Sequence, residues 1–325
     1  MSEVTTIYPA TLMLGWDIGK QNMRGAWMDT LVGGILVVGD GGVYRRYSVS
    51  GSLIGNYDKS ASAGFRDVAV DSTAYTYIDV SNSGSYAIER YYTAGQYLGS
   101  YPRPGIYSWL GSVVGKIFIR GANIYIPMTE VASPYRIRVD IYNARYGTLV
   151  SQWYCLTDGI RGSAVSGFHV DSTAKYFYMA FFDIGVVVKY YLHTEGGEYY
   201  LQEMWRFGTV GGGPMSYPCG LTVDEANGYV YVTSLSAPYR MWVLRASTGE
   251  LLWTWDCYHY AGIDDYTDFG GVSDLVIDTN RNVYMLMLGG QVLKFKGFYD
   301  NSTHEVVKKY SIAAKKLWTF QFGPI

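Results

Sequence analysis

The sequence predicts an all-β fold built from repeated four-stranded antiparallel units. Aromatic residues make up 17% of the 325 residues, and aromatic side chains favour strands. The chain also holds 39 glycines, which supply the backbone conformations of tight turns. In addition, two short phrases of strand, turn and strand recur in the same order along the chain. A spacing of about 40 to 50 residues between copies is typical of repeat architectures.

The first phrase is an apolar run, a polar tight turn that contains an aspartate, and a second apolar run. Two of its copies share the five residues VDSTA. Each copy predicts a β-hairpin, because a turn signal separates two strand-forming runs. The strong copies span Val68–Val80, Phe168–Ala180, Leu221–Thr233 and Leu275–Met287, and the weaker ones Ala26–Gly39 and Ile117–Met128, the last with Arg120 in place of the aspartate.

A second phrase follows each copy of the first and ends on an aromatic residue. The six copies end at Tyr57, Tyr101, Trp153, Trp205, Trp253 and Trp318. Five of their six turns carry glycine, as a turn with positive φ requires: Gly51, Gly95, Gly147, Gly196 or Gly197, and Gly249. We expect the closing aromatic residues to pack between units, and an insertion between Gly289 and His304 to lengthen the last unit.

Six units of four antiparallel strands predict a six-bladed β-propeller. A single blade could not bury both of its faces, so stacking of neighbouring blades would supply the core. Residues 26–325 are predicted to form this one domain. Residues 1–25 are an N-terminal strand or arm, within which Thr5–Asp17 either pairs with the last blade and closes the ring or contacts a partner.

The repeat resembles a known family. Val-Asp, three residues and Asn-Val-Tyr-Val, followed by a strand, a glycine turn and a final aromatic residue, is similar to the NHL repeat. The segment Arg245–Trp255 also resembles the repeat of quinoprotein-type propellers. The resemblance covers about Ala26 to Phe322 and implies the propeller architecture. Propellers of this superfamily include scaffolds, receptors, lyases, lactonases and dehydrogenases, so the resemblance does not select an activity.

Composition argues against several classes of protein. The net charge of −2 lacks the basic excess of a nucleic-acid-binding domain. The sequence contains no run of about 18 apolar residues, so no transmembrane helix is predicted. The first residues lack the pattern of a standard signal peptide. Cys155, Cys219 and Cys257 are odd in number and widely spaced, which fits free thiols, with one disulfide and one free thiol as the alternative.

Several polar residues of the first hairpins have both a structural and a functional interpretation. The repeated aspartates are expected to accept local backbone hydrogen bonds in their turns, and a ring of carboxylates is the functional alternative. His169 in an inner strand would be a ligand or base if it faces the central channel, and a partnered strand histidine otherwise. No nucleophile-elbow or zinc-protease motif is present. The aspartates are Asp29, Asp71, Asp171, Asp224 and Asp278.

The loop Asp256–Gly271 is the longest on the face that carries the connections between blades and between the second and third strands of each blade. No lysine or arginine lies between Asp256 and Asp278. Tyrosine gives rigid contact area at low entropic cost, and carboxylates beside it can bond to hydroxyl groups. The loop therefore supplies the candidate ligand-binding residues: Tyr258, His259, Tyr260, Asp264, Asp265, Tyr266 and Asp268.

No cofactor and no catalytic residue is predicted, and a divalent cation is the alternative, because hard cations take oxygen ligands from such clusters. Abundant Tyr, Ser, Gly and Thr with 17% charged residues resembles structural proteins of archaeal viruses. We therefore expect a non-enzymatic binding or structural propeller, extracellular or on a virion. Its loop face would contact a protein or glycan partner, as in host attachment, with assembly into a homo-oligomer or particle as a further expectation.

Two alternatives remain from the sequence. One is an intracellular scaffold that binds proteins. The other is a metal-dependent hydrolase of the lactonase type, which needs a metal held by oxygen ligands at the mouth of the channel. Its candidate ligands are Asp79, Asn82, Glu130, Asp183 and Asp264.

Overall fold

The computed structural model describes residues 12–20, 22–31, 33–59, 64–82, 85–92, 95–102, 116–129, 137–156, 160, 163–209, 215–235, 240–256 and 271–298. These residues form strands and connecting turns, and they include no helix that could span a membrane. The strands are β1 (Leu12–Asp17), β2 (Met23–Asp29), β3 (Gly34–Gly39), β4 (Val43–Ser48), β5 (Leu53–Asn56), β6 (Gly64–Val70), β7 (Tyr75–Asn82), β8 (Ser85–Tyr92), β9 (Tyr97–Pro102), β10 (Phe118–Arg120), β11 (Asn123–Thr129), β12 (Ile137–Asn143), β13 (Leu149–Leu156), β14 (Val165–Val170), β15 (Tyr176–Phe181), β16 (Val186–Glu195), β17 (Glu198–Phe207), β18 (Pro218–Asp224), β19 (Tyr229–Ser234), β20 (Arg240–Arg245), β21 (Leu251–Asp256), β22 (Val272–Ile277), β23 (Asn282–Met287) and β24 (Gln291–Lys296).

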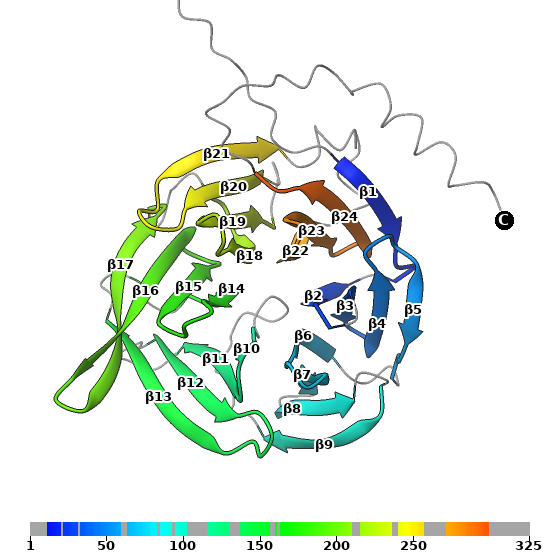
Figure 1. Ribbon diagram of the computed structural model, residues 1–325, viewed down its shortest axis with the longest axis horizontal. Coiled ribbons are helices and arrows are strands. Elements are labelled where there is room, and N and C mark those ends of the chain that lie inside the picture. The colour runs from blue at the N-terminus through cyan, green and yellow to red at the C-terminus, as the bar shows by residue number, and fades with distance from the viewer. Residues whose placement is uncertain are drawn as a thin grey trace, which may run out of the picture.

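The strands pair into four-stranded antiparallel sheets and one eight-stranded sheet. The four-stranded sheets have the orders β2-β3-β4-β5, β6-β7-β8-β9, β18-β19-β20-β21 and β1-β24-β23-β22. The eight-stranded sheet consists of two antiparallel meanders, β10 to β13 and β14 to β17, which meet where Tyr154–Leu156 pairs in parallel with Tyr200–Gln202. Figure 1 shows the sheets around a central axis with β2, β6, β10, β14, β18 and β22 innermost, which is the arrangement of a β-propeller.

The repeated aspartates hold the turns between the first and second strands. The backbone N–H groups of Thr73 and Tyr75 donate to Asp71 Oδ1 at 2.8 and 2.9 Å. The N–H group of Asn282 donates to Asp278 Oδ1 at 2.8 Å in the equivalent turn. Because these carboxylates satisfy donors that the turn would otherwise leave unpaired, the structural interpretation of the repeated aspartates is confirmed.

The closing aromatic residues pack between neighbouring sheets, as predicted, and three of them lie on the turn glycine of the next sheet. At Gly95 and Gly147 φ is +81° and +66°, and a Cβ atom there would overlap the rings of Tyr57 and Tyr101. Glycine is therefore required at these positions for two reasons: the turn needs a positive φ, and the aromatic ring leaves no space for a Cβ atom. The same contact joins Trp205 to Gly249 and Trp16 to Gly51.

The contact of Trp16 with Gly51 corrects the expected arrangement of the last sheet. Its third strand is β24, which lies inside the predicted insertion and buries Val292, Leu293 and Phe295. Its outer strand is β1, from the segment predicted as a closing strand or an arm, and Trp16 pairs opposite Val292. The residues around Trp318, expected to fill these two positions, lie outside the described residues.

The sequence interpretation was wrong at β24 because this strand, although it buries three apolar residues, lacks the glycine turn and closing aromatic residue of the second phrase. The core itself lies between the sheets. One of its clusters joins the two halves of the eight-stranded sheet, where Trp153 and Phe177 pack edge to face at 5.7 Å. Burial of each such side chain contributes about 1.5–3 kcal/mol.

Candidate functional site

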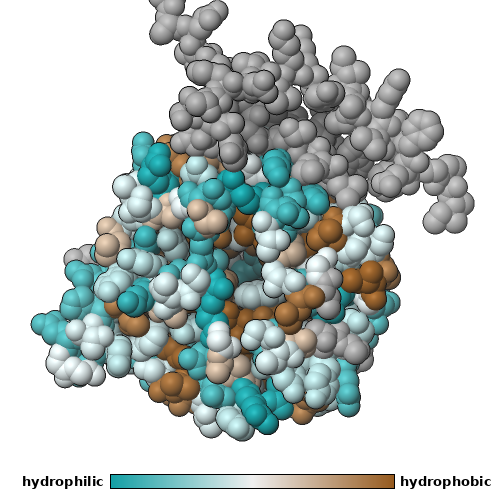
Figure 2. Space-filling view, in the orientation of Figure 1, coloured by the Kyte–Doolittle hydropathy of each residue, from teal (hydrophilic) through white to brown (hydrophobic). Residues whose placement is uncertain are grey.

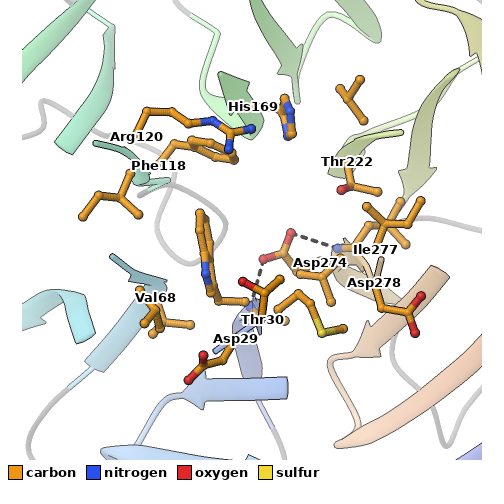
Figure 3. Close-up of a pocket in the computed structure, with 18 of the residues that line it drawn as sticks. Asp29, Thr30, Val68, Phe118, Arg120, His169, Thr222, Asp274, Ile277 and Asp278 are labelled. Carbon is orange, nitrogen blue, oxygen red and sulfur yellow. Dashed lines mark hydrogen bonds between the residues drawn. The ribbon is translucent and has the colours of Figure 1, made fainter. Parts of the chain in front are cut away.

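A cavity of about 500 Å³ lies on the central axis. It is lined by the first strands of the sheets, β2, β6, β10, β14, β18 and β22, and by the turns that follow them. Figure 2 shows a hollow at the centre of the face that it draws, and Figure 3 shows side chains from several sheets around the cavity. Apolar and polar residues share the lining about equally, and ten of the polar ones are Asp, Glu, Lys or Arg.

Three charged residues form the inner end of the cavity, which we call the floor cluster: Asp67, Lys116 and Asp274. They occupy equivalent positions of the repeat, four residues before the turn aspartate or Arg120, where the other copies have glycine. Lys116 Nζ lies 2.9 Å from Asp274 Oδ2 and 3.7 Å from Asp67 Oδ1. All three are buried.

Backbone donors fix the two carboxyl groups of the floor cluster. The N–H group of Ile117 donates to Asp67 Oδ2 at 2.8 Å. The N–H group of Ala26 donates to Asp274 Oδ2 at 3.0 Å, and that of Leu275 donates to Asp274 Oδ1 at 2.9 Å. Figure 3 shows Asp274 pointing to the middle of the cavity, whereas the turn carboxylates of Asp29 and Asp278 point away from it.

Burial dominates the protonation of the floor cluster. It raises the pKa of Asp67 to about 8, although Lys116 acts in the opposite direction. Burial alone would lower the pKa of Lys116, but the neighbouring carboxyl groups of Asp274 and Asp67 outweigh it and raise that pKa. Lys116 is therefore charged at neutral pH, and Asp67 retains its proton.

A second group, the mouth cluster, consists of Arg120, His169 and Glu225 from three different strand regions. Arg120 Nη2 lies 2.5 Å from Glu225 Oε1, and Arg120 Nε donates to the carbonyl of Val170 at 3.0 Å. His169 Nε2 lies 3.2 Å from Glu225 Oε1, and the N–H group of Ser172 donates to Glu225 Oε2 at 2.8 Å. The carboxylate thus receives three donors.

The pKa shifts of the mouth cluster follow from these contacts. Burial alone would raise the pKa of Glu225, but hydrogen bonds from His169 and Ser172 outweigh it and lower that pKa to about 2. Burial lowers the pKa of His169, which its bond to Glu225 opposes. At neutral pH the mouth cluster therefore holds a charged Arg120–Glu225 pair beside a neutral imidazole.

Aromatic rings connect the two clusters along one side of the cavity. Trp27 and Phe118 pack edge to face at 5.1 Å, and Phe118 contacts the His169 ring at 4.7 Å. The Arg120 guanidinium lies 5.3 Å from the centre of the Phe118 ring. Thr222 lies across the cavity from Phe118 (Figure 3). The cavity therefore offers one aromatic wall, a buried polar end and a charged rim.

The predicted ligand-binding residues, Tyr258, His259, Tyr260, Asp264, Asp265, Tyr266 and Asp268, lie outside the described residues, so their role stays a prediction. Of the alternative metal ligands, Glu130 and Asp264 also lie outside. Asp79 is buried in β7, Asn82 ends the same strand, and Asp183 is exposed after β15, where it accepts from the N–H group of Ala164. Within the part of the chain that the structure describes, no group of three or more His, Cys, Asp or Glu side chains could hold a metal ion.

Sequence reasoning noted His169 and Arg120 but missed Asp67, Lys116, Glu225 and Asp274. The sequence could have indicated these residues, because each differs from the residues that most other repeat copies have at the same position. Lys116 stands where other copies have glycine or aspartate, and Glu225 stands where Thr30, Ser72, Ser172 and Thr279 follow the turn aspartate. Cys155 and Cys219 are free thiols, and burial raises the pKa of Cys219 to about 12. Cys257 lies outside the described residues.

Comparison with known proteins identifies a similar fold and no family. No family model and no curated protein matches the chain. The crystal structure of a protein of unknown function from Bacteroides caccae is similar with a TM-score of 0.54 and 13% identity, over 78% of this chain and 85% of that chain. The crystal structure of the computationally designed Ika8 protein matches with a TM-score of 0.44 and 13% identity, over 84% of this chain and 70% of that chain. The first likeness shows the fold alone, and no argument rests on the second.

Proposed function

We propose that this chain is a six-bladed β-propeller of NHL-like repeats and a non-enzymatic binding protein, with its ligand site in the central cavity. The blade count is supported by the two halves of the eight-stranded sheet. Each half has the strand order of the four-stranded sheets, and only a short parallel pairing joins them. The contact of Trp16 with Gly51 would close the ring between the last blade and the first.

The proposed function is supported by the position of the residues that differ from the repeat pattern. Residues that recur in the blades, such as the turn aspartates, stabilise the fold. The residues that break the pattern come from three blades and meet on the cavity, among them Lys116 and Arg120 from one blade, His169 from the next and Glu225 from the one after. Places where a sequence abandons its local rule are expected at functional sites.

Binding is favoured over catalysis by the chemistry of these groups. The Arg120 and Glu225 charges neutralise each other, and His169 donates to the same carboxylate. Cys219, which interacts with Lys116 and Asp274 of the floor cluster, is buried with a raised pKa, which keeps it as an inert thiol. A cavity of this kind can hold a small molecule or the end of a glycan chain. A location outside the cell or on a virion, and a protein or glycan partner on the loop face, stay predictions.

The test is a ligand screen by thermal unfolding with the cavity filled by mutation. Thr222→Trp places a large side chain in the cavity, and Thr254→Trp makes the same change on exposed β21 as the matched control. Small molecules and short glycans that raise the melting temperature of the natural protein should fail with Thr222→Trp and succeed with Thr254→Trp.

Two results would contradict the proposal. One is a set of ligands that stabilise Thr222→Trp as strongly as the natural protein, which would place binding elsewhere. The other is recovery of a bound compound as a reaction product by mass spectrometry, which would identify an enzyme.

A further inference from the structure

The floor cluster has two carboxyl groups and one cation. Lys116 Nζ is in contact with Asp274, at 2.9 Å, but is 3.7 Å from Asp67 Oδ1, beyond hydrogen-bond distance. Asp67 is only 3% exposed, so water gives this oxygen little solvation. The Asp67 carboxyl group accepts hydrogen bonds from the backbone N–H groups of Ile117 and Val68, and a positive group beside it would favour its ionised form.

The carboxyl group of Asp67 cannot turn away from the cavity that it lines. Its Oδ2 atom is held by the N–H group of Ile117. On its other side it lies against Gly25, where even a Cβ atom would come within 2.5 Å of Oδ1. The arrangement is therefore preorganised, and little reorganisation is needed to receive a donor.

The walls above the floor cluster also suit a positive group with an apolar body. Trp27 is half-buried and lines the cavity together with Phe118. Aromatic faces attract ammonium groups and accommodate methylene chains. At the rim, Glu225 neutralises Arg120, so the mouth cluster does not repel a cation.

We propose that the central cavity binds a small primary-ammonium compound, with its ammonium group on Asp67 Oδ1 beside Asp274 and its apolar body against Trp27 and Phe118. This inference rests on the proposed binding function and specifies the class of its ligand. The ammonium group would pair with the negative charge that Asp67 carries once its carboxyl group has lost its proton.

Binding would be coupled to release of a proton. The pKa of Asp67 is raised to about 8, so this carboxyl group is protonated at neutral pH and must lose its proton to pair with the ammonium group. The titratable groups around it are Lys116, Asp274 and Cys219, whose pKa is also raised, and Asp79 lies opposite on β7. Affinity should therefore rise about tenfold per pH unit below pH 8.

The experiment is isothermal titration of the whole protein with n-butylammonium chloride at pH 6, 7 and 8, in buffers of different ionisation enthalpy. 1-Butanol, of nearly the same shape, is the uncharged control. We expect binding of the cation only, with release of close to one proton at pH 6. Asp67→Asn should weaken binding at pH 8 at least tenfold and abolish proton release, whereas Asp183→Asn, on an exposed loop, should change neither.

Equal binding of 1-butanol, unchanged binding by Asp67→Asn, or binding without proton release would overturn the inference. So would failure of n-butylammonium to bind. Such a failure is distinguishable from failure of the proposed function, because neutral ligands blocked by Thr222→Trp would still establish the cavity as a binding site. Proton release in the natural protein keeps the test valid even if a variant does not fold.

Discussion

Replacement of Trp16 by alanine tests whether the N-terminal strand closes the ring. Trp16 lies on Gly51 and contacts the rings of Tyr47 and Tyr284, each with centroids at 6.3 Å. A buried tryptophan covers about 150–250 Å². Trp16 is mostly buried, so about two thirds of that area is removed from water, which contributes about 2.5–4 kcal/mol at about 25 cal/mol per Å². Each ring pair adds about 0.5–1.5 kcal/mol.

We therefore expect Trp16→Ala to lower the free energy of unfolding by about 3–5 kcal/mol, the usual cost of truncating a core tryptophan. Equilibrium unfolding in urea measures it, with Trp318→Ala as the comparison, since the sequence pattern assigns the closing position to Trp318. A loss below about 1 kcal/mol for Trp16→Ala, or an equal loss for Trp318→Ala, would refute the assignment of ring closure to β1.

Three further predictions concern the cavity and the turns. The pKa of Asp67 is raised, so the folded state holds a proton between about pH 4 and pH 8 that the unfolded state has lost. The contribution of Asp67 to stability therefore falls as pH rises through this window, by at most about 1.4 kcal/mol per pH unit. Urea unfolding of Asp67→Asn at pH 5, 7 and 9 should lack that fall. Parallel curves for the two proteins would be evidence against a protonated Asp67. The pKa of Glu225 is lowered to about 2, so its contribution to the free energy of unfolding is present above about pH 4.5 and is lost as pH falls toward 2. Glu225→Gln should remove this acid sensitivity and cost about 1–3 kcal/mol at pH 7, as urea unfolding would measure. An unchanged acid transition in the variant would contradict this prediction. Gly147→Ala should cost more than about 1 kcal/mol in urea unfolding, because φ is +66° and the added Cβ atom overlaps the Tyr101 ring, whereas Gly196→Ala, with positive φ and open space, should cost less.

Much of the fold could be predicted because its repeating devices are local. The turn aspartates and the glycines of the second phrase act within a few residues, so their spacing in the sequence reflects the hairpins directly. The closing aromatic residues were also predictable, and three of them, Tyr57, Tyr101 and Trp153, lie six residues after the glycine of their turn. In the last sheet, pairing of Thr5–Asp17 with the last blade was one of two expectations, but β24 was not predicted as its partner, because the two strands lie far apart in the chain and no local pattern specifies their contact.

The candidate site was less predictable for the same physical reason. Lys116 reaches Asp274 and Arg120 reaches Glu225 across the axis, between segments that are far apart in the sequence. Their identities give no spacing motif, unlike a metal-binding or phosphate-binding loop. Only alignment of the repeat copies against one another exposes them, as residues that depart from the pattern of their position.

One of the two weaker copies of the first phrase supplies two of the three lysine and arginine residues that line the cavity. Lys116 and Arg120 lie at and just before β10, which has three residues and is the shortest strand among the described elements. The turn after β10 lacks the aspartate that holds equivalent turns, so Arg120 extends over the rim to Glu225. The glycine of other copies is likewise replaced by a lysine that crosses to Asp274. The same substitutions thus make β10 irregular and bring charged groups into the cavity. This coincidence indicates that they serve a function of the cavity and not the stability of the fold.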